Sequence, residues 1–130
     1  MDDRVRDLIE NGAQTIVGLD VILFYQANPS TFDTPLGIAL RTHRSLNEVE
    51  PALERLAEGG ILERHTRGDG KYTCYALSKD LTVWNLLCLV SEAYIDNPEQ
   101  RKEIVRMLIR RQQAQRLSGD RKLAPGGETL

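Results

Sequence analysis

The hydrophobic period of the chain changes at Gly59-Gly60, and this change constrains the fold more than any other feature of the sequence. Before the glycines, apolar residues recur at the spacing of one helix face: Val49, Leu53 and Leu56. After the glycines, the runs 61–66 and 71–77 have the composition of β-strands and enclose the turn sequence RGDG. Because glycine commonly ends a helix, we expect an amphipathic helix followed directly by a β-hairpin.

A short helix and a turn precede that amphipathic helix. Thr34 is the expected N-cap of the short helix, and Pro35 takes its first position, where the missing N–H of proline costs nothing. This helix should end near Arg41, so that residues 42–45 form the turn. An earlier, mostly buried helix is predicted over residues 18–28, where the following proline ends it.

Two residues compete to cap the amphipathic helix. Ser45 forms a capping box with Glu48, and Asn47 forms a looser one with Glu50. Pro51 favours the later start, because a proline deeper in a helix removes a backbone hydrogen bond at a cost of roughly 3 kcal/mol. We therefore expect Asn47 to be the cap.

Helices should also flank this central part on both sides. Residues 3–10 form a short amphipathic arm, and residues 81–94 form a helix, containing Trp84, that is apolar around much of its circumference and should be buried. Asn97-Pro98 starts a last helix that reaches about Leu117. The predicted regions are an N-terminal helical arm (1–17), a central domain (18–79), C-terminal helices for packing or dimerisation (80–117) and a disordered tail (118–130).

Composition and charge exclude several function classes. A chain of 130 residues suits one domain, and its net charge of −2 gives no global reason to bind nucleic acid. The C-terminal part is nevertheless basic, with eight Lys or Arg against four Asp or Glu from residue 98 onward. We find no nucleophile motif, phosphate-binding glycine loop, paired cysteine spacing, targeting signal or membrane-spanning run, so we expect a cytoplasmic protein that is not an enzyme and has no metal or cofactor.

The stretch TPLGIALRTHRSLNEVEPALERLAEGGILER, followed by HTRGDGKYTCYALS, resembles the winged helix-turn-helix domain of bacterial and archaeal transcriptional regulators. In that family a short helix, a tight turn and a longer helix lead into a hairpin whose second strand ends in an aromatic-x-Leu, as Tyr75-Ala76-Leu77 does here. The resemblance implies a mainly α fold with a small β-hairpin, built as a winged helix-turn-helix core with flanking N- and C-terminal helices. It also implies a homodimeric, DNA-binding transcriptional regulator.

The same resemblance assigns DNA contacts to the turn, the longer helix and the wing. Asn47, Pro51 and Arg55 would lie at the groove of double-stranded DNA, where the Asn47 amide could pair with adenine. The remaining positions would hold phosphates or border the turn: Arg41, His43, Arg44, Ser45, Arg64, Arg67 and Lys71.

The charge of the longer helix keeps other functions open. Its outward positions Glu48, Glu50, Glu54 and Glu58 oppose a polyanion, and basic residues on hairpins and turns are common on any soluble surface. The main alternative is a winged-helix adaptor whose acidic helix binds a basic protein partner. A metal or redox sensor is a third class, with the scattered ligands His65, Cys74 and Cys88.

Overall fold

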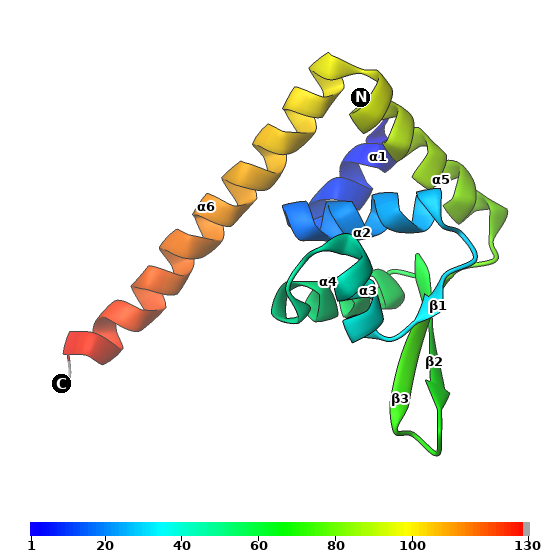
Figure 1. Ribbon diagram of the computed structural model, residues 1–130. Coiled ribbons are helices and arrows are strands. Elements are labelled where there is room, and N and C mark those ends of the chain that lie inside the picture. Colours follow the sequence, from blue (N-terminus) through cyan, green and yellow to red (C-terminus); the bar gives the residue numbers. More distant parts are fainter. Residues whose placement is uncertain (129–130) are drawn as a thin grey trace.

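The computed structural model describes the backbone of residues 1–128 and the side chains of residues 1–117. Figure 1 shows a helical body, a hairpin that projects from it and one long helix that leaves it. The elements follow the chain in the order α1 (Asp3–Asp7), η1 (Leu8–Ala13, a π-helix), α2 (Ile16–Ala27), β1 (Phe32–Asp33), α3 (Pro35–Thr42), α4 (Leu46–Glu58), β2 (Leu62–Arg67), β3 (Tyr72–Leu77), α5 (Leu81–Ser91), η2 (Glu92–Asp96, a π-helix) and α6 (Pro98–Glu128).

The core lies where α2 packs against α4, α5 and the N-terminal arm. The predicted stripe of α4 is confirmed, since Val49, Leu53 and Leu56 are almost completely removed from solvent. The arm also contributes to the core, because its predicted apolar residues are all buried: Val5, Leu8 and Ile9. Burial of apolar side chains on both sides of α2 therefore fixes the position of α4 in the body.

The predicted N-cap of α3 is confirmed, whereas the predicted N-cap of α4 is not. Thr34 caps α3 as predicted, and its side-chain oxygen accepts a hydrogen bond of 3.2 Å from the Gly37 backbone. The prediction that Asn47 caps α4 is wrong, because Ser45 is the N-cap and Pro51 lies inside the helix. Pro51 is exposed, so water can hydrate the backbone carbonyl that its missing N–H leaves free, and an early start becomes tolerable.

The sheet has one strand more than the predicted hairpin. Its antiparallel strands lie in the order β1-β3-β2, and β1 places Phe32 opposite Ala76 and Asp33 opposite Tyr75. The hairpin itself is joined to the core by a buried hydrogen bond of 2.8 Å, which the Tyr25 hydroxyl donates to the Tyr75 carbonyl. The base of the wing is therefore held by α2 and by β1.

The C-terminal helices depart from the prediction in exposure and length. The helix predicted over 81–94 is α5 followed by η2, and it is covered on one side only, since Val90 is buried whereas Leu81 is 73% exposed. The last helix was expected to end near Leu117, but α6 continues to Glu128. Gly119 alone costs a helix only about 1 kcal/mol, but α6 also runs through Pro125, Gly126 and Gly127, so helix propensity does not account for its last turn.

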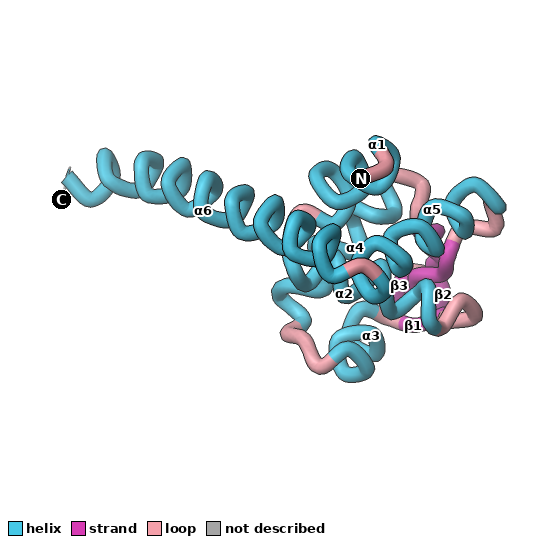
Figure 2. Tube along the Cα trace, turned by 90° about the horizontal axis from the view of Figure 1, so that it is seen from above, coloured by secondary structure: helices cyan, strands magenta, loops and turns pink. Residues whose placement is uncertain are grey.

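Figure 2 shows how α6 projects away from the rest of the molecule, with only its first part beside the body. Ile104 and Leu108 of that first part are buried. The disordered tail predicted for residues 118–130 has its side chains outside the described part, and residues 129 and 130 lie outside it altogether. Within the described chain, no helix combines the length and the apolar character that a membrane crossing requires.

Candidate nucleic-acid interface

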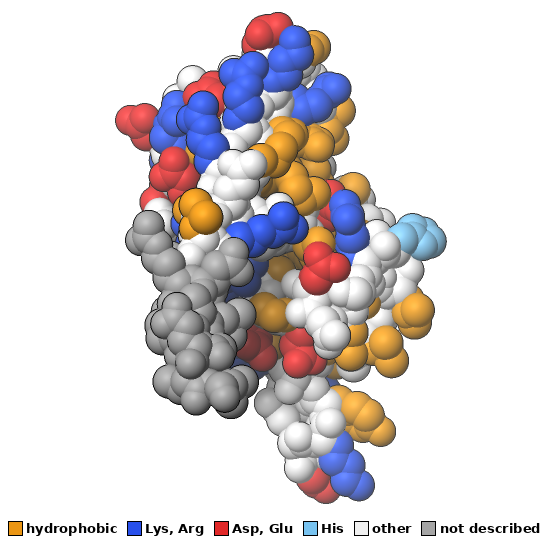
Figure 3. Space-filling model, turned by 90° about the vertical axis from the view of Figure 1, so that its left-hand side faces the viewer, with side chains coloured by type: hydrophobic (Ala, Val, Ile, Leu, Met, Phe, Trp, Pro, Cys, Tyr) orange, Lys and Arg blue, Asp and Glu red, His pale blue; other side chains and the backbone are white. Residues whose placement is uncertain are grey.

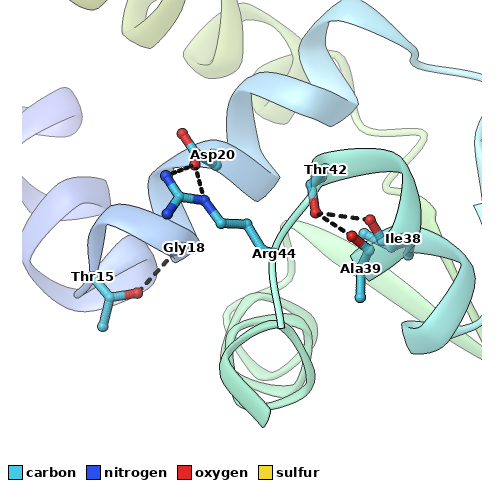
Figure 4. A network of polar contacts seen from close by, with 7 residues as sticks. All are labelled: Thr15, Gly18, Asp20, Ile38, Ala39, Thr42 and Arg44. Carbon is cyan, nitrogen blue, oxygen red and sulfur yellow. Dashed lines mark hydrogen bonds and ion pairs between the residues drawn. The ribbon is translucent and has the colours of Figure 1, made fainter. Parts of the chain in front are cut away.

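The turn between α3 and α4 is built by backbone hydrogen bonds. His43 has a left-handed conformation with φ 58°, and the N–H of Arg44 then returns to the Ala39 carbonyl at 3.1 Å. The Thr42 hydroxyl donates to the Ile38 carbonyl at 2.8 Å, which satisfies another acceptor at the helix end (Figure 4). The turn predicted at residues 42–45 is therefore present, and its left-handed residue reverses the chain.

An ion pair attaches this turn to the body. The Nε atom of Arg44 donates to the Asp20 carboxylate of α2 at 2.7 Å, and Figure 4 shows the guanidinium reaching across from the turn. Both side chains are about one-third exposed, at 39% and 32%. Arg44 therefore has a structural partner, and it is available to a phosphate only in addition to that role.

The wing carries exposed positive charge at its tip. Gly68, Asp69 and Gly70 all have positive φ, and the N–H of Lys71 closes the turn on the Gly68 carbonyl at 3.1 Å. The side chains of Lys71 and Arg67 on either side of this turn are exposed. Two of the three left-handed positions are glycine, the residue that adopts this conformation without strain, which explains why RGDG forms the tip.

Phe32 lies beside side chains of the wing, a position that the sequence did not predict. Its ring is 45% exposed, and the Arg67 guanidinium lies 5.3 Å from the ring centroid. The His65 ring lies 5.4 Å away on the same face of the sheet. The sequence offers one signal for this position, an aromatic residue placed between the polar pair Ser30-Thr31 and the helix start at Thr34-Pro35.

Arg64 lies on the face of the sheet opposite to Phe32 and His65, toward the acidic residues of α4. Its Nε atom donates to the Tyr75 hydroxyl at 3.4 Å. This hydrogen bond raises the pKa of Arg64, and the carboxylates of Glu54 and Glu58 contribute in the same direction. The last two acidic residues of the α4 outer face therefore lie near a cation of the wing, which partly balances their charge.

The first turn of α4 leaves few groups free. The Ser45 hydroxyl donates to the Glu48 carboxylate at 3.0 Å, so these two residues are engaged with each other. Asn47, Glu50 and Pro51 are exposed, as the prediction for the outer face requires. The amide of Asn47 is thus the uncharged polar group that this turn offers to a base edge.

The prediction that Arg55 lies on the outer face of α4 is wrong. The side chain is half-buried, and its Nη2 atom donates to the Ala13 carbonyl of η1 at 3.0 Å. Position 55 borders the buried residue Leu56, so the long arginine stem follows the body toward the N-terminal arm. Arg55 therefore binds the arm, and it is not among the exposed cations.

Four of the predicted contact residues are exposed Arg, Lys or His side chains that make neither an ion pair nor a side-chain hydrogen bond among residues 1–117, unlike Arg44 and Arg64: Arg41, His43, Arg67 and Lys71. The Arg41 guanidinium lies 4.8 Å from the centroid of the Phe24 ring, which orients it without neutralising it. These residues form two groups, one at the end of α3 and one at the tip of the wing. In the described part of the chain, no three His, Cys, Asp or Glu side chains gather as a metal site would require.

Several solved structures resemble the chain, among them two with TM-scores above 0.5. A protein described as a possible transcriptional regulator from Methanosarcina mazei Go1 superposes with a TM-score of 0.53 at 17% identity, over 78% of this chain and 85% of its own. ZitR from Lactococcus lactis, in a doubly substituted form, gives a TM-score of 0.52 at 13% identity, over 89% of this chain and 75% of its own. The sequence matches no family model, and a search of curated proteins found no match.

This structural likeness agrees with the order of the elements. A short helix, a turn and a longer helix are followed by a hairpin, and flanking helices stand on both sides, as the sequence predicted. The chain therefore has the winged helix-turn-helix fold, with α3 and α4 as its two characteristic helices and β2-β3 as its wing.

Proposed function

We propose that the protein is a DNA-binding transcriptional regulator of the winged-helix type. The observation that carries this proposal is the pair of cationic groups, Arg41 with His43 and Arg67 with Lys71, at the turn before α4 and at the wing tip. Cations in these positions suit the phosphates on either side of a DNA groove. The first turn of α4 would lie between them, where Asn47 can reach a base edge.

In this interface the turn and the wing would bind phosphates, and α4 would contact bases. Phosphate contacts hold a protein on DNA without reading its sequence, and the turn and the wing supply the side chains for them. The outer face of α4 supplies Asn47 and Pro51 for base contacts but also Glu50, which repels phosphate. Affinity in this arrangement comes from the wing and the turn, whereas α4 contributes register and specificity.

The comparison with known structures supports the same class of function. The similar protein from Methanosarcina mazei Go1 is described as a possible transcriptional regulator, and it shares the fold over most of both chains. Because one fold can serve several functions, we base the proposal on the cations and use the likeness only as support.

We further propose that the regulator is a homodimer that forms through α6. Ile109 and Leu117 of this helix are 44% and 63% exposed, although both are large and apolar. A second copy could cover them, and a two-fold dimer would match a palindromic operator. Light scattering on the intact protein should give twice the mass of one chain, and Ile109→Glu should shift the mass toward that of a monomer.

A salt-dependent DNA titration tests the proposed function. Fluorescence anisotropy with mixed-sequence duplex DNA should show binding at about 50 mM salt that weakens steeply by about 200 mM. Four phosphate contacts per chain would give a slope of log K against log salt of about −4. Absence of binding at the lower salt concentration would overturn the proposal and would favour an adaptor whose acidic α4 face binds a basic protein.

A further inference from the structure

The end of α3 and the turn after it carry Arg41, His43 and Arg44, and of these Arg44 has an acidic partner. Arg41 and His43 make no ion pair among residues 1–117, whereas Arg44 is paired with Asp20 of α2. Figure 4 shows the Arg44 guanidinium directed at the Asp20 carboxylate. A negative charge is therefore held among the cations that the proposed interface would turn toward phosphates, although a carboxylate repels them.

The fold has other contacts that hold the turn and the start of α2. The N–H of Arg44 closes the turn on the Ala39 carbonyl at 3.1 Å. The side chain of Thr15 caps α2 by accepting a hydrogen bond of 2.9 Å from the Gly18 N–H. Ion pairs as exposed as that of Arg44 contribute little to stability. The main effect of the Asp20 carboxylate is therefore on the charge of the turn.

The ion pair leaves Arg44 accessible but offsets its charge. A guanidinium has more N–H donors than this pair uses, since Asp20 is bonded by the Nε and Nη2 atoms alone. A phosphate can therefore approach the remaining N–H groups. It meets a pair that is neutral as a whole, because the carboxylate lies only 2.7 Å from Nε and repels the phosphate while the guanidinium attracts it.

Basic side chains are plentiful in other parts of the surface. Figure 3 shows Lys and Arg side chains gathered along α6, outside the proposed interface. At the wing tip, Arg67 and Lys71 make no ion pair among residues 1–117. Positive charge is thus reduced by an acid at the turn before α4, where the chain would meet DNA.

We propose that Asp20 is a positioning residue of the DNA interface, which acts through Arg44 and lowers the affinity of the turn for phosphate. This role rests on the proposed function, because it concerns the affinity of the same interface. While the Asp20 carboxylate holds Arg44, the arginine neutralises no phosphate charge, and about four cations per chain remain for that purpose. Phosphate contacts do not read sequence, so Asp20 lowers binding to every duplex alike and leaves base contacts a larger share of the affinity.

Anisotropy of the full chain with mixed-sequence duplex DNA tests this role. Asp20→Asn keeps a hydrogen-bond acceptor for Arg44 but removes the negative charge. It should tighten binding about eightfold at about 0.1 M salt and make the salt slope steeper by about 0.9, as one further phosphate contact does. The Tm should stay within about 5 °C of that of the unmodified protein.

Asp96→Asn is the matched control. It makes the same chemical change at an exposed residue of η2, which lies far from α3 in Figure 1. Because charges beyond the screening length of salt act weakly, it should change the affinity by less than about twofold. An equal gain in Asp96→Asn would show that only net charge matters and would contradict the proposal.

A double variant separates Asp20 from Arg44. Asp20→Asn combined with Arg44→Gln replaces one neutral pair by another, so its affinity should equal that of the unmodified protein within about twofold. A gain that persists in the double variant would mean that Asp20 repels DNA by itself and does not act through Arg44, which would overturn the proposal.

The remaining outcomes distinguish this proposal from the proposed function. Duplex binding that Asp20→Asn leaves unchanged or weakens would overturn the role of Asp20 alone. A larger loss of Tm in Asp20→Asn would also overturn it, because the carboxylate would then be structural. Absence of duplex binding at about 50 mM salt, in both the unmodified protein and Asp20→Asn, would overturn the two proposals together. Binding by Asp20→Asn alone would support the role of Asp20.

Discussion

The helix α4 and the wing differ in how their polar side chains are used. In α4, Ser45 is bonded to Glu48 and Arg55 is bonded to the N-terminal arm, and a buried stripe fixes the whole helix against α2. In the wing, Arg67 and Lys71 stand exposed on either side of a glycine-rich turn. Three polar side chains at α4 and its cap thus make contacts within the fold, whereas at the wing tip the only such contact of a charged side chain among residues 1–117 is that of Arg67 with Phe32.

This difference explains how an acidic helix can belong to a DNA-binding interface. Glu48 is hydrogen-bonded by Ser45 but keeps its charge, whereas the carboxylates of Glu54 and Glu58 raise the pKa of Arg64, so a cation of the wing offsets part of the negative charge of α4. Glu50 has no such partner among the described side chains. In the proposed interface the helix would contribute shape and one amide, and the turn and the wing would contribute attraction.

The largest expected effect is on the buried side of α4. Leu53→Ala should lower the free energy of unfolding by about 2–5 kcal/mol, because it removes core contacts and leaves a cavity. Leu53 is fully buried, so the cavity that the substitution leaves is lined by apolar side chains and gains nothing from entering water. Thermal or urea unfolding measures the change, and Glu50→Ala on the exposed side of the same helix should stay within about 0.5 kcal/mol. Similar losses for both variants would contradict the division between the two sides.

The next effect is on DNA affinity at the wing tip. Arg67→Ala combined with Lys71→Ala should weaken binding about 60-fold at about 0.1 M salt, since each phosphate contact contributes about eightfold there. The salt slope should become shallower by about two, and stability should change by less than about 0.5 kcal/mol. Lys102→Ala with Arg110→Ala makes the same charge change on α6 and should have a much smaller effect. Equal losses for the two pairs would mean that only net charge matters.

A smaller effect should appear where the wing joins the body. Tyr25→Phe leaves the Tyr75 carbonyl without its buried donor and should cost about 1–2 kcal/mol of unfolding free energy. Tyr72→Phe removes the same hydroxyl from an exposed position of β3 and provides the control. Both changes are followed by chemical denaturation. Equal stability of the two variants would show that the hydrogen bond does not hold the wing.

The features that local chemistry determines could be predicted from the sequence. Thr34-Pro35 starts a helix wherever its neighbours allow one, and the turn of Gly68, Asp69 and Gly70 favours a hairpin on its own. The buried stripe of α4 follows from the helical spacing of Val49, Leu53 and Leu56, because only a helix places these three residues on one face. These signals determined the order of the elements and hence the fold.

The features that depend on distant partners could not be predicted. The strand β1 has two residues, too few for any period, and it exists because β3 offers an edge to Phe32. The cost of Pro51 inside α4 depends on whether its face meets water, which is a tertiary property. The direction of Arg55 is set by a carbonyl 42 residues earlier in the chain, and helical spacing carries no information about it.

The smallest expected effect concerns the acidic side of α4 and separates two roles for its carboxylates. Glu50→Gln combined with Glu54→Gln removes two negative charges and should strengthen DNA binding about three- to fivefold at low salt, because exposed charges about 10 Å from phosphates contribute only a few tenths of a kcal/mol each. Anisotropy measures the gain, and Glu10→Gln with Glu92→Gln should leave affinity nearly unchanged, since both residues are exposed on other elements. Weaker binding would instead show that a carboxylate accepts a hydrogen bond from cytosine, and α4 would then read bases through its acids as well as through Asn47.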